Sequence, residues 1–293
     1  MPFRHFQFGL GGFYTFNLVS SNLAKPGSIT GSPNRYEIGL FQIQNPSQTN
    51  NLYKLEYFCL KYQLKNVQAT LQKQLLQTPF INPQDGSMRP TFEDGLYIKC
   101  VHPKTTREGG WPYNILPRST IQWFSVPDSI GWYAQGLNLS GSAGNYRDNL
   151  SGSGIGLFGI THQVNKTVSI KLWKQFVENI FNTSLIESNY MPSIHQQNQD
   201  KTYMLKGNTA YIFSGRVGLK NQLMETTLNY TRIADNDRFL NPCEWGIEPF
   251  YTFMYRERNE GNGNLNAVNV ECKMESPFKK IVIGRTTRLL CTA

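Results

Sequence analysis

Apolar and polar residues alternate along much of the chain with a period of two, the spacing of a β-strand whose side chains point to opposite faces. In the clearest example, Tyr57 to Gln72, apolar residues occupy even positions up to Leu64 and odd positions from Val67 onward. One extra residue, at Lys65-Asn66, changes the face in this way. The pattern predicts a long, bent, half-buried strand with a bulge.

Shorter segments of the same character, bounded by Gly, Pro, Asn and Asp, predict further strands. Only Trp173 to Phe181 has helical spacing, with apolar residues at 176, 177, 180 and 181. We therefore expect an all-β fold with at most one or two short helices. The other predicted strands are 13–19, 36–44, 96–101, 120–126, 164–172, 211–213, 250–255, 268–270 and 280–283.

Two polar stretches contain too few apolar residues to be core elements. Residues 136–159 are rich in Gly, Ser and Asn, and residues 187–201 include His195 among several amides. Stretches of this kind usually lie at the surface of a domain. No linker separates two cores, so we expect residues 1–293 to form a single domain with long surface loops at 136–159 and 187–201.

The composition shows an excess of basic over acidic residues. Charged residues make up only 17% of the chain, yet the net charge is +9 and the isoelectric point is about 9.3. This charge attracts a polyanion or an anionic membrane surface, although solubility alone also explains it. The residues after Glu275 include no acid and four bases, which favours a polyanion.

Sequence features that are missing from the chain narrow the range of functions that we expect. The five cysteines form no C-x-x-C pair, so we expect reduced, mostly buried thiols and neither a disulfide framework nor a zinc site. No apolar run reaches the length of about 18 residues that a membrane helix needs, and the first residues lack the apolar segment of a signal peptide. We expect a chain that is made and kept in the cytosol or nucleus, without membrane insertion, metal or cofactor.

No motif announces a reaction. Residues 154–159 match G-x-G-x-x-G, but the preceding segment is polar, so a flexible loop is the better interpretation. Asp235-Asn-Asp237 is more typical of a turn than of a calcium site. The four histidines lie far apart, and nothing places the acidic pairs Glu93-Asp94 and Glu257/Glu260 in one cleft. We expect no enzymatic activity.

Aromatic residues crowd the region from Trp111 to Tyr146, near Lys104, Arg107, Arg118 and Arg147. Such residues form stacking platforms for single-stranded nucleic acid or for sugars. They also hold irregular loops and subunit contacts together, and the two interpretations are compatible.

Two segments carry a resemblance to a known family. Phe13-Tyr-Thr-Phe16-Asn-Leu18 and the later stretch from Leu52 to Leu71 resemble the first strands of capsid proteins from small single-stranded DNA viruses, and Phe253 to Arg258 is similar to a closing strand. The resemblance implies a single eight-stranded antiparallel jelly roll. The chain lacks the arginine-rich arm with which many such capsids begin, because its first 30 residues contain only Arg4 and Lys25.

The resulting hypothesis is a capsid protein that self-assembles, in about 60 copies or more, into a closed icosahedral shell around a single-stranded nucleic-acid genome. It implies a virion protein assembled in the host cytoplasm or nucleus, with a receptor that the sequence does not identify. The alternatives are a carbohydrate-binding or adhesion β-sandwich, which would use the aromatic platform, and a β-rich hydrolase. The predicted phosphate-contacting residues are Lys61, Lys65, Lys279, Lys280, Arg285 and Arg288.

Overall fold

The structure is a computed structural model. It describes residues 5–29, 31–33, 38–83, 89–118, 120–132, 146–189, 191–199, 209–254, 258–275 and 282–292, with only the backbone at 275 and 282–292. No helix in these ranges is long and apolar enough to cross a membrane.

The strands are β1 (Phe6–Thr15), β2 (Leu52–Leu64), β3 (Val67–Gln74), β4 (Phe92–Val101), β5 (Thr105–Leu116), β6 (Phe124–Ser125), β7 (Ile155–Gln163), β8 (Ser169–Val177), β9 (Phe181–Ser188), β10 (Met191–Asn198), β11 (Thr209–Lys220), β12 (Met224–Ile233), β13 (Leu265–Glu275) and β14 (Val282–Thr292). Two one-turn 3-10 helices, η1 (Pro127–Ser129) and η2 (Cys243–Trp245), accompany them.

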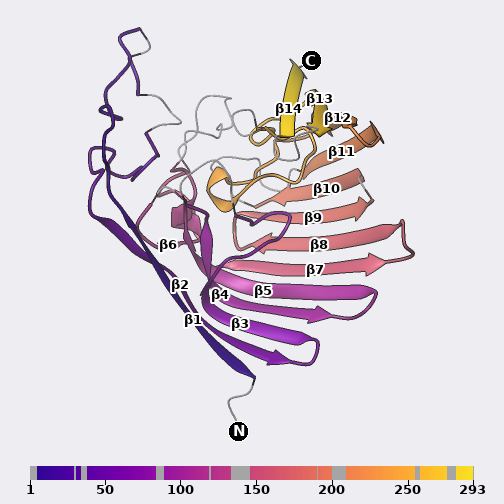
Figure 1. Cartoon of the computed structure of the whole chain (residues 1–293), viewed down its shortest axis with the longest axis horizontal. Coiled ribbons are helices and arrows are strands. Elements are labelled where there is room, and N and C mark those ends of the chain that lie inside the picture. The colour runs from indigo at the N-terminus through magenta and orange to yellow at the C-terminus, as the bar shows by residue number, and fades with distance from the viewer. Residues whose placement is uncertain are drawn as a thin grey trace.

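Thirteen of the strands form one antiparallel meander in which spatial order follows chain order from β1 to β14, and β6 pairs with β5 beside it (Figure 1). A jelly roll instead needs Greek-key connections between strands that are distant in the chain. The chain is all-β, but the prediction of an eight-stranded jelly roll is wrong. Short turns join some neighbouring strands, such as β2 to β3 and β8 to β9, whereas long connections join β1 to β2, β5 to β7 and β12 to β13.

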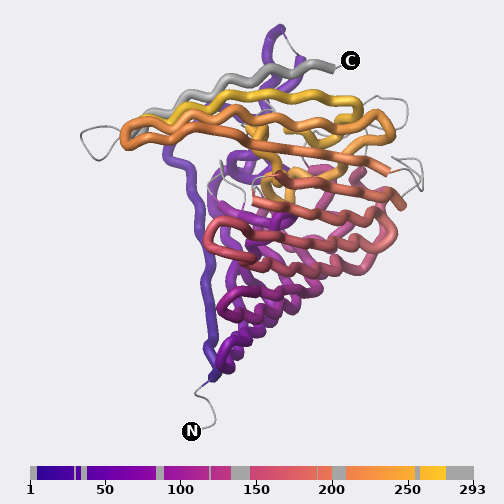
Figure 2. Tube along the Cα trace, turned by 90° about the vertical axis from the view of Figure 1, so that its right-hand side faces the viewer, coloured from indigo at the N-terminus to yellow at the C-terminus, as the bar shows by residue number. Residues whose placement is uncertain are grey.

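The sheet is strongly curved: in Figure 2, β1 runs steeply while β12 and β13 cross the top of the view. Residues 239–252, which follow β12, lie against one face. The Gln196 side chain on β10 donates to the Leu240 carbonyl at 2.7 Å, and the Thr252 hydroxyl donates to Thr231 on β12 at 2.7 Å. We call this face, which carries Gln196 and Thr231, the inner face, and the opposite one the outer face.

The predicted bulge at Lys65-Asn66 is a hairpin turn between two strands. Leu64 pairs with Val67, and Lys65 has a φ of 49°, in the left-handed region. Cross-strand partners share a face, so Leu60 and its partner Leu71 face the same way although one position is even and the other odd. A hairpin turn and a bulge therefore leave the same mark on the sequence: in both cases the apolar residues move from even to odd positions.

The predicted helix at Trp173 to Phe181 is also wrong. Residues up to Val177 belong to β8, residues 178–180 form a turn with Asn179 at a φ of 61°, and β9 begins at Phe181. The apolar residues with helical spacing belong to two neighbouring strands and the turn that joins them.

Both predicted long loops contain strands. Residues 187–198 complete β9 and form β10, and residues 155–159 begin β7. Residues 136–145 lie outside the described residues. The shorter strand predictions at 96–101, 211–213 and 268–270 are confirmed within β4, β11 and β13. The segment 120–126 forms only the two-residue β6.

Glycines on β7 and just before it make room for tryptophan rings rather than for a dinucleotide. A Cβ atom on Gly159 would lie 2.5 Å from the ring of Trp173 on β8, and one on Gly154 would lie 2.5 Å from the ring nitrogen of Trp111 on β5. The G-x-G-x-x-G match is thus explained by close packing of aromatic rings on a strand. The expected flexible loop is wrong here.

A conventional hydrophobic core fills one end of the inner face. Trp245 and Phe80 are completely buried there, beside the inward residues Ile155 and Phe181 of the sheet. The Trp245 indole nitrogen donates to the Ser129 hydroxyl at 2.8 Å, so its one polar group is satisfied. This core fixes the segments at 75–83 and 239–252 against the sheet.

Candidate functional site: the polar inner face

Beyond that core the strands reverse the polarity of a soluble sheet. On β12, Leu228 and Tyr230 point outward and are 50% and 38% exposed, whereas the alternate residues Asn229 and Thr231 are completely buried on the inner face. A soluble antiparallel sheet buries its apolar side and exposes its polar side. Here the apolar side faces out.

The outer apolar surface continues across the strands. Cross-strand pairing aligns Leu60 of β2 with Leu71 of β3 and Leu96 of β4, and aligns Phe213 of β11 with Ser193 of β10. Contiguous apolar surface of such extent normally faces another protein or a membrane. Its exposed members include Phe8, Leu10, Leu60, Leu71, Leu96, Ile98, Phe158, Leu172, Ile186, Phe213, Leu228, Tyr230 and Val270.

The inner face carries ion pairs between neighbouring strands. Lys99 Nζ of β4 lies 3.3 Å from Glu108 Oε2 of β5, and Lys171 Nζ of β8 lies 3.0 Å from Glu187 Oε1 of β9. Further along, an Arg216 nitrogen of β11 lies 2.9 Å from a Glu271 oxygen of β13. Charges of both signs therefore line the inner face from β4 to β13.

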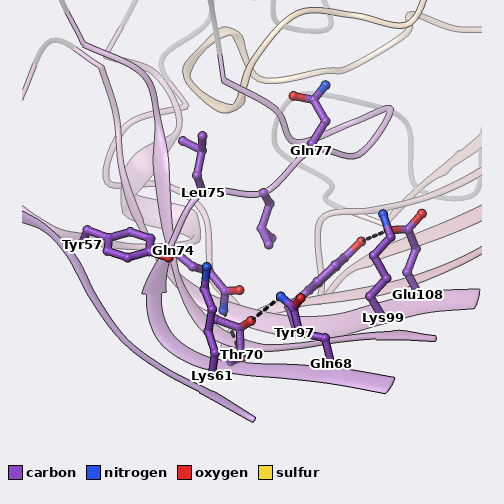
Figure 3. Close-up of a pocket in the computed structure, with 11 residues that line it drawn as sticks. Tyr57, Lys61, Gln68, Thr70, Gln74, Leu75, Gln77, Tyr97, Lys99 and Glu108 are labelled. Atoms are coloured by element: carbon purple, nitrogen blue, oxygen red, sulfur yellow. Dashed lines mark hydrogen bonds and ion pairs between the residues drawn. The ribbon is translucent and has the colours of Figure 1, made fainter. Parts of the chain in front are cut away.

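One polar hollow of about 400 Å³ lies on the inner face of β2–β5 (Figure 3). The Tyr97 hydroxyl donates to Glu108 Oε2 at 3.0 Å, which orients the carboxylate that also binds Lys99. Lys61 Nζ lies 5.4 Å from the centre of the Tyr57 ring, and no ion pair joins Lys61 to an acid in the described part of the chain. Two lysines and one glutamate thus line this hollow.

A second hollow of about 420 Å³ adjoins the first, since Gln77 and Glu108 line both. Its sheet side carries Lys171 and Glu187, together with Trp173. Its other side is formed by residues 248–251 of the segment that lies over the inner face. The two hollows form a polar trough with fixed charges along the sheet.

Buried hydrogen bonds hold the segment that closes over this trough. Glu248 accepts from the backbone N–H groups of Asn259 and Glu260 at 2.7 and 2.9 Å. Burial raises the pKa of Glu260 well above its usual value, and its Oε2 has no hydrogen-bond partner among the described residues. Burial also raises the pKa of the Cys243 thiol to about 12, which keeps the sulfur protonated and unsuited to nucleophilic attack.

The acidic pair Glu93-Asp94 stabilises the fold through hydrogen bonds and an ion pair. Glu93 Oε2 accepts from the Leu76 backbone N–H at 2.9 Å, and Asp94 binds Lys73 and the Tyr113 hydroxyl, each at 3.0 Å. No group of three or more His, Cys, Asp or Glu residues that could hold a metal ion occurs within the described ranges.

The described members of the predicted phosphate-contacting set lie at different points of the sheet. Lys61 faces the hollow at β2, whereas Lys65 occupies the β2–β3 turn. The backbones of Arg285 and Arg288 pair with Cys272 and Asn269 of β13, at the other end of the sheet order. Lys279 and Lys280 lie outside the described residues.

The described aromatic residues near Trp111 hold loops together. The Trp123 ring nitrogen donates to the Leu55 carbonyl at 3.0 Å, and Lys73 Nζ lies 4.7 Å from the centre of the Trp123 ring. The Arg147 guanidinium lies 3.8 Å from the centre of the Trp132 ring. These contacts join distant segments rather than form an open stacking platform.

Comparison of the chain with known proteins gives structural matches only. No family model matches it, and no curated protein matches it in sequence. A BenF-like porin from Pseudomonas fluorescens Pf-5 is similar in structure, with a TM-score of 0.69, 11% identity, and coverage of 97% of this chain and 70% of the porin. The fold resembles that of bacterial outer-membrane porins.

Two Pseudomonas aeruginosa proteins match comparably. OccK2 (OpdF) in complex with glucuronate has a TM-score of 0.67 and 11% identity, covering 82% of this chain and 64% of that one. OpdK with vanillate has a TM-score of 0.62 and 11% identity, covering 81% and 62%. The chain spans about three fifths of OccK2 and OccD3, at 60% and 58% of their lengths. These neighbours are channels, not enzymes.

These matches overturn several expectations from the sequence. The structural neighbours are membrane-embedded channels rather than jelly-roll capsids, so the predictions of a capsid, of a homo-oligomeric shell around a nucleic-acid genome, of a virion location and of no membrane insertion are wrong. The carbohydrate-binding or adhesion β-sandwich is contradicted by the same fold.

Proposed function

We propose that this chain is a membrane channel wall that lets small charged organic solutes pass along its inner face. The observation that carries the proposal is the reversed polarity of the sheet, apolar outside and polar inside. Transmembrane β-barrels have this pattern because lipid contacts one face of each strand and water the other. The porin-like fold supports a place in a bacterial outer membrane and a transport role rather than catalysis.

The energetics of the two faces point the same way. Each apolar outer residue gains roughly 25 cal/mol for every Å² of surface removed from water, and lipid supplies that burial. The inner ion pairs Lys99–Glu108 and Lys171–Glu187 instead require contact with water, because moving a charge into hydrocarbon costs several kcal/mol. Only one orientation of the sheet satisfies both: outer face to lipid, inner face to water.

The charges in the first hollow favour organic anions. Lys61 and Lys99 stand there against the single carboxylate of Glu108. Two structural neighbours were solved with glucuronate and vanillate, which are both carboxylates. We propose that a solute carboxylate pairs with Lys61 while Lys99 stays with Glu108.

A channel in lipid also needs closed sheet edges, because unpaired backbone groups do not persist in hydrocarbon. The edges are β1 and β14, and no pairing joins them among the described residues. Twelve successive antiparallel pairings separate β1 from β14, so the two strands run in the same direction. Closure of one chain on itself through these edges would therefore create a parallel seam in an otherwise antiparallel wall.

Conductance in planar lipid bilayers tests the proposed function. Full-length protein should produce discrete current steps, and the reversal potential in a gradient of sodium glucuronate should show permeation by the anion. Lys61→Gln should reduce anion preference severalfold, since it removes the inner lysine that lacks an acidic partner in the described structure.

Lys174→Gln is the matched control. Lys174 lies on the outer face of β8 and donates to Ser184 at 3.0 Å, so its loss should leave anion preference unchanged. Protein that inserts but gives no current would show that the sheet lines no open passage. Equal effects of the two substitutions would remove Lys61 from the solute path.

A further inference from the structure

The outer face has a groove that the channel proposal does not use. It has a volume of about 420 Å³ and crosses β9 to β12. Strand pairing places Ile186, Ser193, Phe213 and Arg232 in one row across these four strands. Ser193 is the small member of that row, so a depression forms between the larger side chains of Ile186 and Phe213.

The next row along the strands completes the groove. Ser184, His195 and Tyr211 are cross-strand neighbours, and the His195 ring lies 5.1 Å from the centre of the Tyr211 ring. The groove therefore combines hydrocarbon and aromatic walls with His195 and Arg232. Its volume is within the range typical of ligand pockets, roughly 300–1,000 Å³.

Arg232 is the unusual member because it places a permanent positive charge on a largely apolar face. One guanidinium nitrogen, Nη2, donates to Asn264 Oδ1 at 2.7 Å. The other, Nη1, is buried and has no hydrogen-bond partner among the described residues, and no described acid forms an ion pair with Arg232. The partly exposed Arg232 side chain thus carries a positive charge that no described acid neutralises, and an anionic group in the groove could neutralise it.

We infer that this groove binds one anionic phospholipid, with an acyl chain against Ile186 and Phe213 and the phosphate at Arg232. The inference rests on the proposed membrane location of the outer face. Apolar walls beside an arginine fit an amphiphile with an anionic head, and Tyr211 is typical of the aromatic residues that barrels place at headgroup level. A solute without a chain would leave the apolar walls uncovered.

Native mass spectrometry of protein released from mixed vesicles tests the lipid site. The vesicles contain equal amounts of phosphatidylglycerol and phosphatidylcholine with identical chains. The wild type should retain one phosphatidylglycerol, whereas Arg232→Gln should lose this preference about fivefold, the effect expected for one basic residue at an anionic surface. Ser193→Trp should reduce retention of both lipids, because the indole fills the groove.

Arg107→Gln is the control, since Arg107 is an exposed arginine on β5 and is not part of the groove. Soluble glycerol phosphate should not displace the lipid, and displacement at equal concentration would indicate a simple anion site and overturn the inference. Unchanged retention in Arg232→Gln would also overturn it. Conductance of these variants is measured in parallel: current without selective lipid retention contradicts only the lipid site, whereas failure to insert contradicts the channel as well.

Discussion

Two apolar regions of this molecule have similar composition and opposite surroundings. Around Trp245 and Phe80, aromatic and aliphatic side chains are enclosed by protein and are completely buried. On the outer face, Leu71 and Leu228 are 44% and 50% exposed. The inner core is thus stabilised by the chain itself, whereas the outer surface depends on a partner that the chain does not provide, which we propose is lipid.

The largest contrast is expected from truncation in the two regions. Trp245→Ala should destabilise the protein by about 3–5 kcal/mol, because it leaves a cavity and removes the hydrogen bond that the indole donates to Ser129. Leu228→Ala should cost less than about 1 kcal/mol in detergent, because half of this side chain is already exposed and little buried contact is lost. Denaturant unfolding in detergent measures both. Equal losses would mean that the outer face packs like a core.

A charged substitution should affect insertion into the bilayer differently on the two faces of the sheet. Leu71→Arg on the outer face of β3 should make insertion less favourable, by up to about 2–4 kcal/mol, the cost of an arginine at the bilayer midplane. Gln68→Arg, on the inner face of the same strand and beside the first hollow, should change it little. Partitioning between urea-solubilised and vesicle-bound protein compares them. If both substitutions are tolerated, lipid does not contact the outer face.

The smallest effect concerns pH and the segment over the trough. Burial raises the pKa of the Glu260 carboxyl in the folded state. Its contribution to stability is therefore fully present below the unfolded pKa, near 4.5, and is lost as the pH rises through the folded-state pKa. Glu260→Gln stays neutral and should stabilise the protein at pH 8 by about 1 kcal/mol. Unfolding between about pH 5 and 8 should become less pH-dependent.

Glu178 is the control, because its pKa is shifted in the opposite direction from that of Glu260. Hydrogen bonds from the Ser153 hydroxyl and backbone N–H hold its pKa below the usual value, so its contribution is present at neutral pH and lost on acidification. Glu178→Gln should not stabilise the protein at pH 8. A stability profile of Glu260→Gln that parallels the wild type would show that Glu260 does not titrate in this window.

Strand character could be predicted from the sequence, but strand pairing could not. The alternation around Leu60 and Leu71 identified the strands, while a hairpin and a bulge leave the same parity signal at Lys65-Asn66. The helical spacing of Phe176, Val177, Ile180 and Phe181 arose from two strand ends and a turn. Local patterns of this kind do not record which residues lie opposite one another.

The site was harder to predict because the orientation of the sheet is invisible in the pattern. Alternation at Leu228, Asn229 and Tyr230 shows two faces but does not say which one meets solvent. The inner ion pairs, such as Lys171–Glu187, join residues on different strands and depend on register. Lys61 lies on the polar face of its strand, as predicted, yet its assignment to nucleic acid relied on overall charge, and the porin-like fold does not support that partner.

Accessibility of spin labels along β12 tests the central claim most directly. Single nitroxide labels placed from Leu228 to Thr231 in a cysteine-free background, in bilayers, report collisions with oxygen, which concentrates in lipid, and with a water-soluble nickel chelate. The account predicts high oxygen and low nickel accessibility at 228 and 230, and a lower ratio of oxygen to nickel accessibility at 229 and 231. High nickel and low oxygen accessibility at 228 and 230 would contradict an outer face in contact with lipid.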